Sequence, residues 1–287
     1  MQFSFEALGT TWWIELFENE TIKNLDEVKN FVEVFVSNYE KKYSRFLKDS
    51  QISILNRERS FENPTSEFVK LLEYGKRLYL RSDTHFNLLT GHILESKGYD
   101  ADYSFNASGS NETAGNPITD LSITAELIEL RHGNIDLGGF GKGYLIDLIA
   151  TELKQTLQLE QFFINGGGDM YTTHNNGEPI TIFLEHPTEP GKGIAKATIM
   201  NQGFAASSPH KRVWKNETGE HTHIVSKRLT SDATFIKAAT AADADAFATT
   251  ALQLSQQDLE RLAKSEQLGI ALFDIKSGKL VSNQSFA

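Results

Sequence analysis

The sequence predicts an α+β fold in one domain spanning residues 1–287. Strand-like and helix-like runs alternate through the second half, which indicates a sheet covered by helices. No segment repeats at a fixed period, and the six prolines do not gather in a linker. With 39% hydrophobic and 23% charged residues, the chain has an ordinary globular composition and can build a large core.

The elements of the first part follow from hydrophobic spacing and capping residues. Residues 2–17 alternate around aromatic and β-branched side chains, which indicates one or two strands. Apolar residues at helical spacing predict a helix over 24–43, with Asn24 as its N-cap. A second helix is expected to begin at Asn63-Pro64 and to run to about residue 81, because a cap residue followed by proline typically opens a helix.

The middle and the second half contain one long polar segment and a series of short elements. Residues 98–120 are rich in Gly, Asn and Ser, which predicts a flexible insertion. After it, strands are expected at 134–137, 162–164, 180–184, 194–200 and 223–225, helices at 143–157, 239–254 and 257–267, and a closing hairpin at 270–274 and 280–282.

Charge and cysteine content exclude several classes of function. The formal net charge is −10, from 28 Lys+Arg and 38 Asp+Glu, which argues against a nucleic-acid partner and against binding to an anionic membrane. Without cysteine, the chain cannot form disulfides, thiolate metal sites or iron–sulfur clusters. The sequence shows neither an export signal nor a membrane span. We therefore expect a cytoplasmic protein without a stable membrane anchor, the alternative being an exported protein whose signal has been removed.

Two glycine-rich segments each follow a strand-like run. Residues 134–144 read NIDLGGFGKGY, and residues 165–169 read NGGGD. Glycines let backbone N–H groups approach a ligand closely, and a helix N-terminus favours anions. A Walker A loop is excluded because Gly143 follows Lys142, and a dinucleotide motif is excluded because its third glycine would fall at Tyr144. Taken alone, the first segment could equally be a tight structural turn, and the second would ordinarily be a flexible surface loop.

An aspartate and a threonine share one face of the helix expected over 239–254. Asp245 and Thr249 are four residues apart, and their oxygen atoms are ligands that suit Mg²⁺. The alternative is that Asp243 and Asp245 only complement the helix dipole.

Two further segments carry candidate polar contacts. His221 and His223 would face the same side of a strand. Two histidines at this spacing can bind zinc, but no third ligand is evident in the nearby sequence. One of them could instead act as an acid or base near neutral pH, or both could be surface residues without a function. Residues 205–210 (AASSPH), followed by Lys211 and Arg212, could contact a phosphate or form a solvated turn.

Taken in order along the chain, these motifs resemble the ApbE family of FAD:protein FMN transferases. The resemblance covers most of the chain. Its motifs are 7–12 (ALGTTW), 43–46 (YSRF), 49–56 (DSQISILN), 136–143 (DLGGFGKG), 165–169 (NGGGD), 205–208 (AASS), 223–224 (HI) and 245–249 (DAFAT).

The resemblance implies a fold of two packed lobes with FAD in the cleft between them and Mg²⁺ near its pyrophosphate. The implied reaction is Mg²⁺-dependent transfer of FMN from FAD to a Ser or Thr hydroxyl of an acceptor flavoprotein, with release of AMP. The acceptor would carry a pattern of the type Asp-x-x-Ser/Thr-Gly-Ala-Ser/Thr. Two alternatives are an FAD pyrophosphatase that gives FMN and AMP, and an FAD-binding protein with impaired catalysis.

The family's functional residues map onto particular positions of this chain. The chain departs from the family pattern at Leu8, Asn87 and Ser226, where the family has Met, Asp and Asp. The implied catalytic residues are His223, as general base, and Asp245; the implied metal ligands are Asp245, Thr249 and the carbonyl of Gly139; and the implied cofactor contacts are Leu8, Phe46, His85, Phe86, Asn87, Asp136, Lys142, Gly143, Gly167, Ser207 and Ile224.

Overall fold

The computed structural model describes residues 1–17, 24–101, 103–106, 113–211, 213–217, 219–222, 224–226 and 228–286. Contacts along the chain divide it into two compact units, each of which is described by itself. The first unit comprises Met1–Asn38, Phe140–Ser208 and Leu229–Ala287, and the second comprises Tyr39–Gly139 and Pro209–Arg228. Helices and sheets occur in both, so the predicted α+β class is confirmed.

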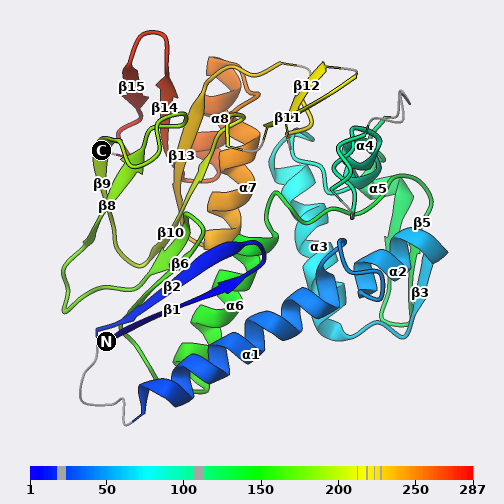
Figure 1. The fold of residues 1–287 in the computed structure, drawn as a ribbon, viewed down its shortest axis with the longest axis horizontal. Helices are drawn as coiled ribbons and strands as arrows, with labels where there is room; N and C mark the ends of the chain where they lie inside the picture. The colour runs from blue at the N-terminus through cyan, green and yellow to red at the C-terminus, as the bar shows by residue number, and fades with distance from the viewer. Residues whose placement is uncertain are drawn as a thin grey trace. The chain divides into compact units, whose positions relative to one another are not determined.

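An eight-stranded antiparallel sheet forms the centre of the first unit, with the strand order β1-β2-β6-β7-β10-β13-β14-β15 (Figure 1). Its strands are β1 (Gln2–Ala7), β2 (Thr10–Leu16), β6 (Phe162–Gly166), β7 (Asp169–Thr172), β10 (Gln202–Ser207), β13 (Ala233–Ala238), β14 (Gly269–Asp274) and β15 (Lys279–Ser282). The same unit contains the hairpin β8 (Ile180–Glu185) and β9 (Gly193–Ile199) and the helices α6 (Gly141–Gln155), α7 (Ala241–Ala251) and α8 (Gln256–Ser265).

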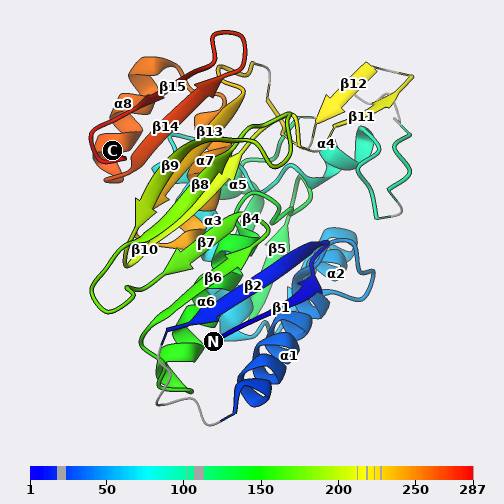
Figure 2. The same ribbon diagram turned by 60° about the vertical axis from the view of Figure 1, so that its left-hand side comes forward.

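Both faces of this sheet are covered. All six side chains of β13 are buried, as expected for a strand packed on both sides. The Thr234 hydroxyl donates to the Ala248 carbonyl of α7 at 2.6 Å, so this residue faces the helices. Its neighbour Phe235 points the other way, into an apolar cluster that includes Ile182 and Ile199 of the β8–β9 hairpin. Figure 2 shows the hairpin and α7 on opposite sides of the sheet.

The second unit combines short helices with a three-stranded antiparallel sheet of order β3-β5-β4 and a separate hairpin, β11–β12. Its elements are α2 (Gln51–Glu58), β3 (Ser60–Glu62), α3 (Ser66–Arg81), α4 (Gly91–Ser96), α5 (Pro117–Asp120), β4 (Leu121–Ile123), β5 (Leu127–Leu130), β11 (Val213–Asn216) and β12 (Gly219–Thr222). Helix α1 (Leu25–Tyr43) belongs to the residue ranges of both units.

Several expected elements are confirmed close to their predicted bounds. Residues 2–17 form two strands, and Asn24 caps α1 by accepting the Asp26 and Glu27 N–H groups at 3.1 and 3.4 Å. The expected strands at 162–164, 180–184 and 194–200, the three helices of the second half and the closing hairpin are also present, with ends shifted by at most three residues.

The strand expected at 134–137 is absent. The Asn56 side chain accepts the Ile135 N–H at 2.7 Å and donates to the Ile135 carbonyl at 3.0 Å. The Asp136 N–H donates to the Leu88 carbonyl at 2.8 Å. These backbone groups are therefore satisfied by a side chain and a loop rather than by a ladder of strands.

Three other boundaries also differ from prediction. Helix α3 is capped by the Thr65 hydroxyl, and not by Asn63. The last four residues of the predicted insertion at 98–120 form α5, because the Asn116 side chain accepts the Ile118 N–H at 2.9 Å. The described residues 224–226 are not a strand. Among the helices of the described ranges, none is long and apolar enough to cross a membrane.

Candidate functional site

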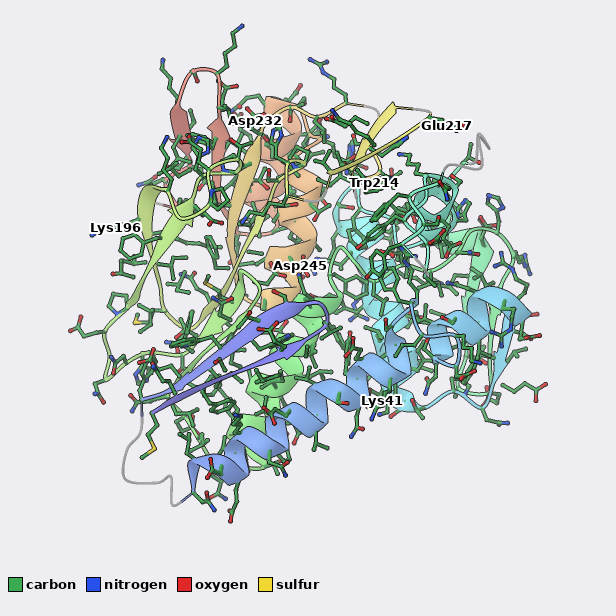
Figure 3. All side chains as sticks on the ribbon, in the orientation of Figure 1. Lys41, Lys196, Trp214, Glu217, Asp232 and Asp245 are labelled. Atoms are coloured by element: carbon green, nitrogen blue, oxygen red, sulfur yellow. The ribbon has the colours of Figure 1, made fainter. Side chains whose placement is uncertain are left out.

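Helix α7 presents a carboxylate and a hydroxyl from the first unit. The Thr240 hydroxyl caps the helix by accepting the Asp243 N–H at 3.1 Å. Asp245, labelled in Figure 3, is buried, and Thr249 lies one turn further along the same face. The Thr249 hydroxyl is 3.4 Å from that of Ser207, the last residue of β10. Three oxygen-bearing side chains therefore meet where β10 ends against α7.

The first turn of α6 lies directly against α7. The Gly143 N–H donates to Asp245 Oδ2 at 3.2 Å. A Cβ atom at residue 143 would lie 2.3 Å from the Ala241 carbonyl oxygen, so only glycine allows this approach. One turn later, the Asp147 carboxylate accepts the N–H groups of Ala241 and Ala242 at 2.8 and 2.9 Å. Two contacts thus hold α6 and α7 in register beside Asp245.

The carboxyl group of Asp147 is unusual in its proton affinity. Its pKa is raised to about 7, chiefly by burial and in smaller part by the nearby Asp243 charge, while the Ala242 and Ala241 N–H groups act in the opposite direction. The contact between α6 and α7 therefore involves an acid that changes its charge near neutral pH.

Lys142 lies between two carboxylates. Its Nζ forms an ion pair with Asp169 Oδ2, and it is 3.9 Å from Asp245 Oδ2. Both acids belong to regular secondary structure, Asp169 to β7 and Asp245 to α7. Lys142, which the sequence predicts to contact an anionic ligand, thus lies beside two carboxylates of the protein itself.

Two turns lie at the same end of the sheet as these residues. Leu8 and Gly9 form the two-residue turn between β1 and β2, with φ values of 52° and 68°. Gly167, with a φ of 69°, lies in the turn between β6 and β7, and a Cβ there would be 2.4 Å from the Thr10 hydroxyl. The register of β2 with β6 pairs Trp12 with Gly166, which brings the two turns together.

The strand register therefore gathers one group of predicted site residues. The β7–β10 ladder pairs Met170 with Phe204, so Ser207 extends toward the β6–β7 turn. Predicted site residues of the first unit at this end of the sheet are Leu8, Lys142, Gly143, Gly167, Ser207, Asp245 and Thr249.

In the second unit, Asp136 organises the glycine-rich segment. One of its oxygens accepts the Gly138 N–H at 2.7 Å, and the other forms an ion pair with Arg45 Nε. Arg45 also donates to the Tyr99 carbonyl at 2.9 Å, and its guanidinium lies 4.3 Å from the centroid of the Phe46 ring. The carboxylate predicted to contact the cofactor thus also has a structural role.

The segment 85–87 is held by its own polar groups. The Asn87 side chain donates to the Gly115 carbonyl and accepts the Leu89 N–H, both at 2.8 Å. Phe86 is buried, and a Cβ on Gly139 would lie 3.1 Å from its ring. His85 is exposed. The backbone of Gly139, whose carbonyl is a predicted metal ligand, therefore packs against the Phe86 ring.

The predicted general base, His223, lies outside the described residues. Ile224, next to it, is buried. Ser226, where the family has aspartate, forms a local turn in which its hydroxyl donates to the Arg228 carbonyl at 2.8 Å and accepts the Arg228 N–H at 3.2 Å. The substitution is accommodated by this turn.

Sequence reasoning missed the residues that support the site. The only indication in the sequence that Arg45 and Asp169 belong to the site is their place in the motifs at 43–46 and 165–169. Asp147 lies in none of the motifs, so the sequence gives no indication of its role. Tyr103 stacks on Phe46 with centroids 5.1 Å apart and planes at 9°. Sequence spacing does not predict that pair, because the two residues are distant along the chain.

The predicted metal ligands are not a cluster of acids and histidines. Within the described ranges, no three such side chains are grouped in a way that could hold a metal ion. The predicted set has one carboxylate, one hydroxyl and one backbone carbonyl, all of them hard oxygen donors that suit Mg²⁺.

The sequence pattern of the ApbE family matches residues 8–273. A curated relative from Rhodobacter capsulatus, named FAD:protein FMN transferase, is 27% identical over 169 residues, which are 56% of this chain and 32% of the relative. The chain thus matches about a third of that relative's length.

Solved structures with the same fold cover almost the whole chain. The ApbE protein from Thermotoga maritima has a TM-score of 0.86 at 17% identity, covering 99% of this chain and 97% of its own. The apo flavinyl transferase ApbE from Pseudomonas stutzeri has a TM-score of 0.81 at 16% identity, covering 99% and 95%. The flavin transferase ApbE from Vibrio cholerae has a TM-score of 0.80 at 16% identity, covering 100% and 97%.

Proposed function

The chain belongs to the ApbE family, and we propose that it is a flavin transferase that moves FMN from FAD to an acceptor protein. The observation that carries this proposal is the group of polar side chains at one end of the first unit's sheet, where Asp245, Thr249, Ser207 and Lys142 converge. The name of the Rhodobacter capsulatus relative supports the choice of FAD as substrate.

Asp245, Thr249 and the Gly139 carbonyl are the proposed ligands of Mg²⁺. The donor chemistry fits, because carboxylate, hydroxyl and carbonyl oxygens are what this cation prefers. When bound, Mg²⁺ supplies charge neutralisation for a pyrophosphate and its leaving group.

The protein's own groups supply position and further positive charge. Lys142 is in the first turn of α6, where an ammonium group and the positive end of the helix dipole both favour a phosphate. Leu8 and Gly167 are in turns at the same end of the sheet, where backbone can approach a ligand.

The transfer step is a substitution at the phosphorus atom of the FMN half. The hydroxyl oxygen of an acceptor Ser or Thr forms a bond to that phosphorus. The bond from phosphorus to the oxygen bridging to AMP breaks, and AMP leaves with that oxygen. His223 accepts the hydroxyl proton as general base. In hydrolysis, water replaces the hydroxyl and free FMN is the product.

The test combines the full chain, FAD, Mg²⁺ and an acceptor protein carrying the Asp-x-x-Ser/Thr-Gly-Ala-Ser/Thr pattern. We expect the acceptor to gain the mass of one FMN group, with one AMP released for each group transferred. Intact-protein mass spectrometry measures the first product and chromatography the second.

Two variants sharpen this test. Asp245→Asn should remove Mg²⁺-dependent transfer, whereas Asp243→Asn, two residues earlier and on another face of α7, should retain it. AMP release with an unmodified acceptor would instead identify an FAD pyrophosphatase. Tight FAD binding without either product would mean that catalysis is impaired, and full transfer by Asp245→Asn would refute the Mg²⁺ site.

A further inference from the structure

Among the described residues, two carboxylates lie within 4 Å of the Lys142 ammonium group. Lys142 Nζ is paired with Asp169 Oδ2 and is 3.9 Å from Asp245 Oδ2. The side chains of Asp169 and Asp245 are only 6% and 8% exposed, whereas that of Lys142 is 23% exposed. The charges interact strongly because water screens them little.

The two carboxylates are held more firmly than the ammonium group. Asp169 opens β7 directly after a turn that is fixed by the bond from the Gly168 N–H to Asn165 Oδ1, at 2.8 Å. Asp245 is on α7 and accepts the Gly143 N–H. Lys142 carries its charge on a flexible four-carbon stem. The position of the ammonium group is therefore set by the acid with which it pairs.

Without the Asp169 charge, the Lys142 ammonium group would lose the carboxylate with which it forms an ion pair, and it would move toward another one. Asp245 is the other carboxylate within 4 Å of Nζ in the described structure. An ammonium group that paired with Asp245 would neutralise the charge that attracts a divalent cation. It would compete with the cation for the same oxygen atoms.

We propose that Asp169 is a positioning residue that keeps the Lys142 ammonium group off Asp245, so that Asp245 can bind a divalent cation. This inference rests on the proposed function, in which Asp245 is a metal ligand. It assigns to the last residue of the Asn-Gly-Gly-Gly-Asp segment a role that acts through Lys142.

The test is a Mn²⁺ titration of the full chain, alone and with FAD, followed by electron paramagnetic resonance of the free ion. Asp169→Asn should raise the Kd for Mn²⁺ by about tenfold or more, because it leaves Lys142 to pair with Asp245. Asp169→Asn combined with Lys142→Met should bring the Kd back to within about threefold of wild type, because the competing charge is gone. The variants are compared without FAD, because Lys142 is also a proposed contact of the FAD phosphates. In that comparison, Lys142→Met alone should bind Mn²⁺ at least as tightly as wild type.

Asp232→Asn is the matched control. Asp232 is another partly buried acid of the same unit and accepts the Ile275 N–H at 2.8 Å. The Kd of this variant for Mn²⁺ should equal that of wild type. Far-ultraviolet circular dichroism checks that each variant folds. If Asp169→Asn does not fold, weaker Mn²⁺ binding by Lys142→Met alone would still overturn the inference.

The remaining outcomes separate the inference from the proposed function. If Asp169→Asn binds Mn²⁺ like wild type, or if the double variant binds as weakly as Asp169→Asn, the inference is wrong while the metal site stands. If wild type does not bind Mn²⁺ under either condition, the metal site of the proposed function is wrong and the inference falls with it.

Discussion

The two units each contain an ion pair that involves one end of the same glycine-rich segment, and the two pairs differ in how they are enclosed. Asp136 lies near the start of the segment (134–144) and pairs with Arg45 in the second unit, where the two side chains are 11% and 4% exposed. Lys142 lies near its end and pairs with Asp169 in the first unit, where the cation is 23% exposed and the Asp245 carboxylate lies 3.9 Å away.

This difference separates a structural pair from one that can respond to a ligand. The Arg45 guanidinium is held by the Asp136 carboxylate, the Tyr99 carbonyl and the Phe46 ring, and Glu95 Oε1 lies 3.7 Å from its Nη1. Among the described residues, each cation thus has a second carboxylate within 4 Å, but the Glu95 side chain is 37% exposed, whereas that of Asp245 beside Lys142 is 8% exposed. Water screens the second acid of the buried Arg45 pair, whereas the more accessible Lys142 lies beside two buried carboxylates that can take up another cation.

The largest effect is expected from Arg45→Met, which leaves Asp136 nearly buried without its cation. Breaking a buried pair from one side costs about 3–5 kcal/mol of stability. Urea unfolding measures the loss. Lys142→Met should cost less, because Asp169 and Asp245 can then be compensated by water or a cation. The control Arg57→Met removes a cation that is 56% exposed and should change stability by less than about 1 kcal/mol. Equal losses for Arg45 and Lys142 would contradict the distinction drawn between the pairs.

A second large effect is expected where α6 approaches α7 in the first unit. Gly143→Ala places a Cβ 2.3 Å from the Ala241 carbonyl oxygen and should cost about 3 kcal/mol, with loss of Mn²⁺ binding as α7 shifts. Thermal unfolding and the Mn²⁺ titration measure the two effects. Gly193→Ala is the matched control, since its Cβ would meet nothing closer than 4.0 Å. A stable Gly143→Ala protein with normal Mn²⁺ affinity would show that this contact is dispensable.

The carboxyl group that joins α6 to α7 should make stability depend on pH. Its pKa in the folded state is raised to about 7, above the ordinary value of 3.8, so the folded state holds the proton more tightly. The stability contributed by protonated Asp147 is present at low pH and is lost as pH rises toward 7, by at most about 1.4 kcal/mol per pH unit. Wild type should therefore lose stability relative to Asp147→Asn between pH 5 and 7. A constant difference in unfolding free energy across this range would rule out the raised pKa.

The smallest effect concerns the turn at Leu8. A leucine at φ 52° is strained, and asparagine tolerates this conformation better, so Leu8→Asn should stabilise the protein by up to about 1 kcal/mol. FAD affinity should fall if Leu8 contacts the cofactor as predicted. The converse change Asn201→Leu, at another turn residue with φ 52°, should destabilise by a similar amount. Differential scanning calorimetry compares the two variants, and a destabilised Leu8→Asn would contradict the expected strain relief.

The sequence predicted the elements whose signals are local. Asn24 caps α1 as expected, and the helices that carry Gly143 and Asp245 lie within a few residues of their predicted bounds. Elements without a distinct local signal were missed. Helix α2 has only eight residues, which is too short for a helical period to stand out in the sequence, and β13 is buried on both faces, so it shows no alternation of apolar and polar residues.

The ordered motifs of the sequence determined the family, the predicted ligands and the likeness to flavin transferases. The four-residue spacing of Asp245 and Thr249 already placed both on one helix face, because helical periodicity is a local property. Only the tertiary structure showed that Lys142 is paired with Asp169, that Arg45 is paired with Asp136, and that Asp147 joins α6 to α7. These contacts connect residues 27, 91 and 94 positions apart. Their formation depends on how strands and helices pack, which no local sequence pattern specifies.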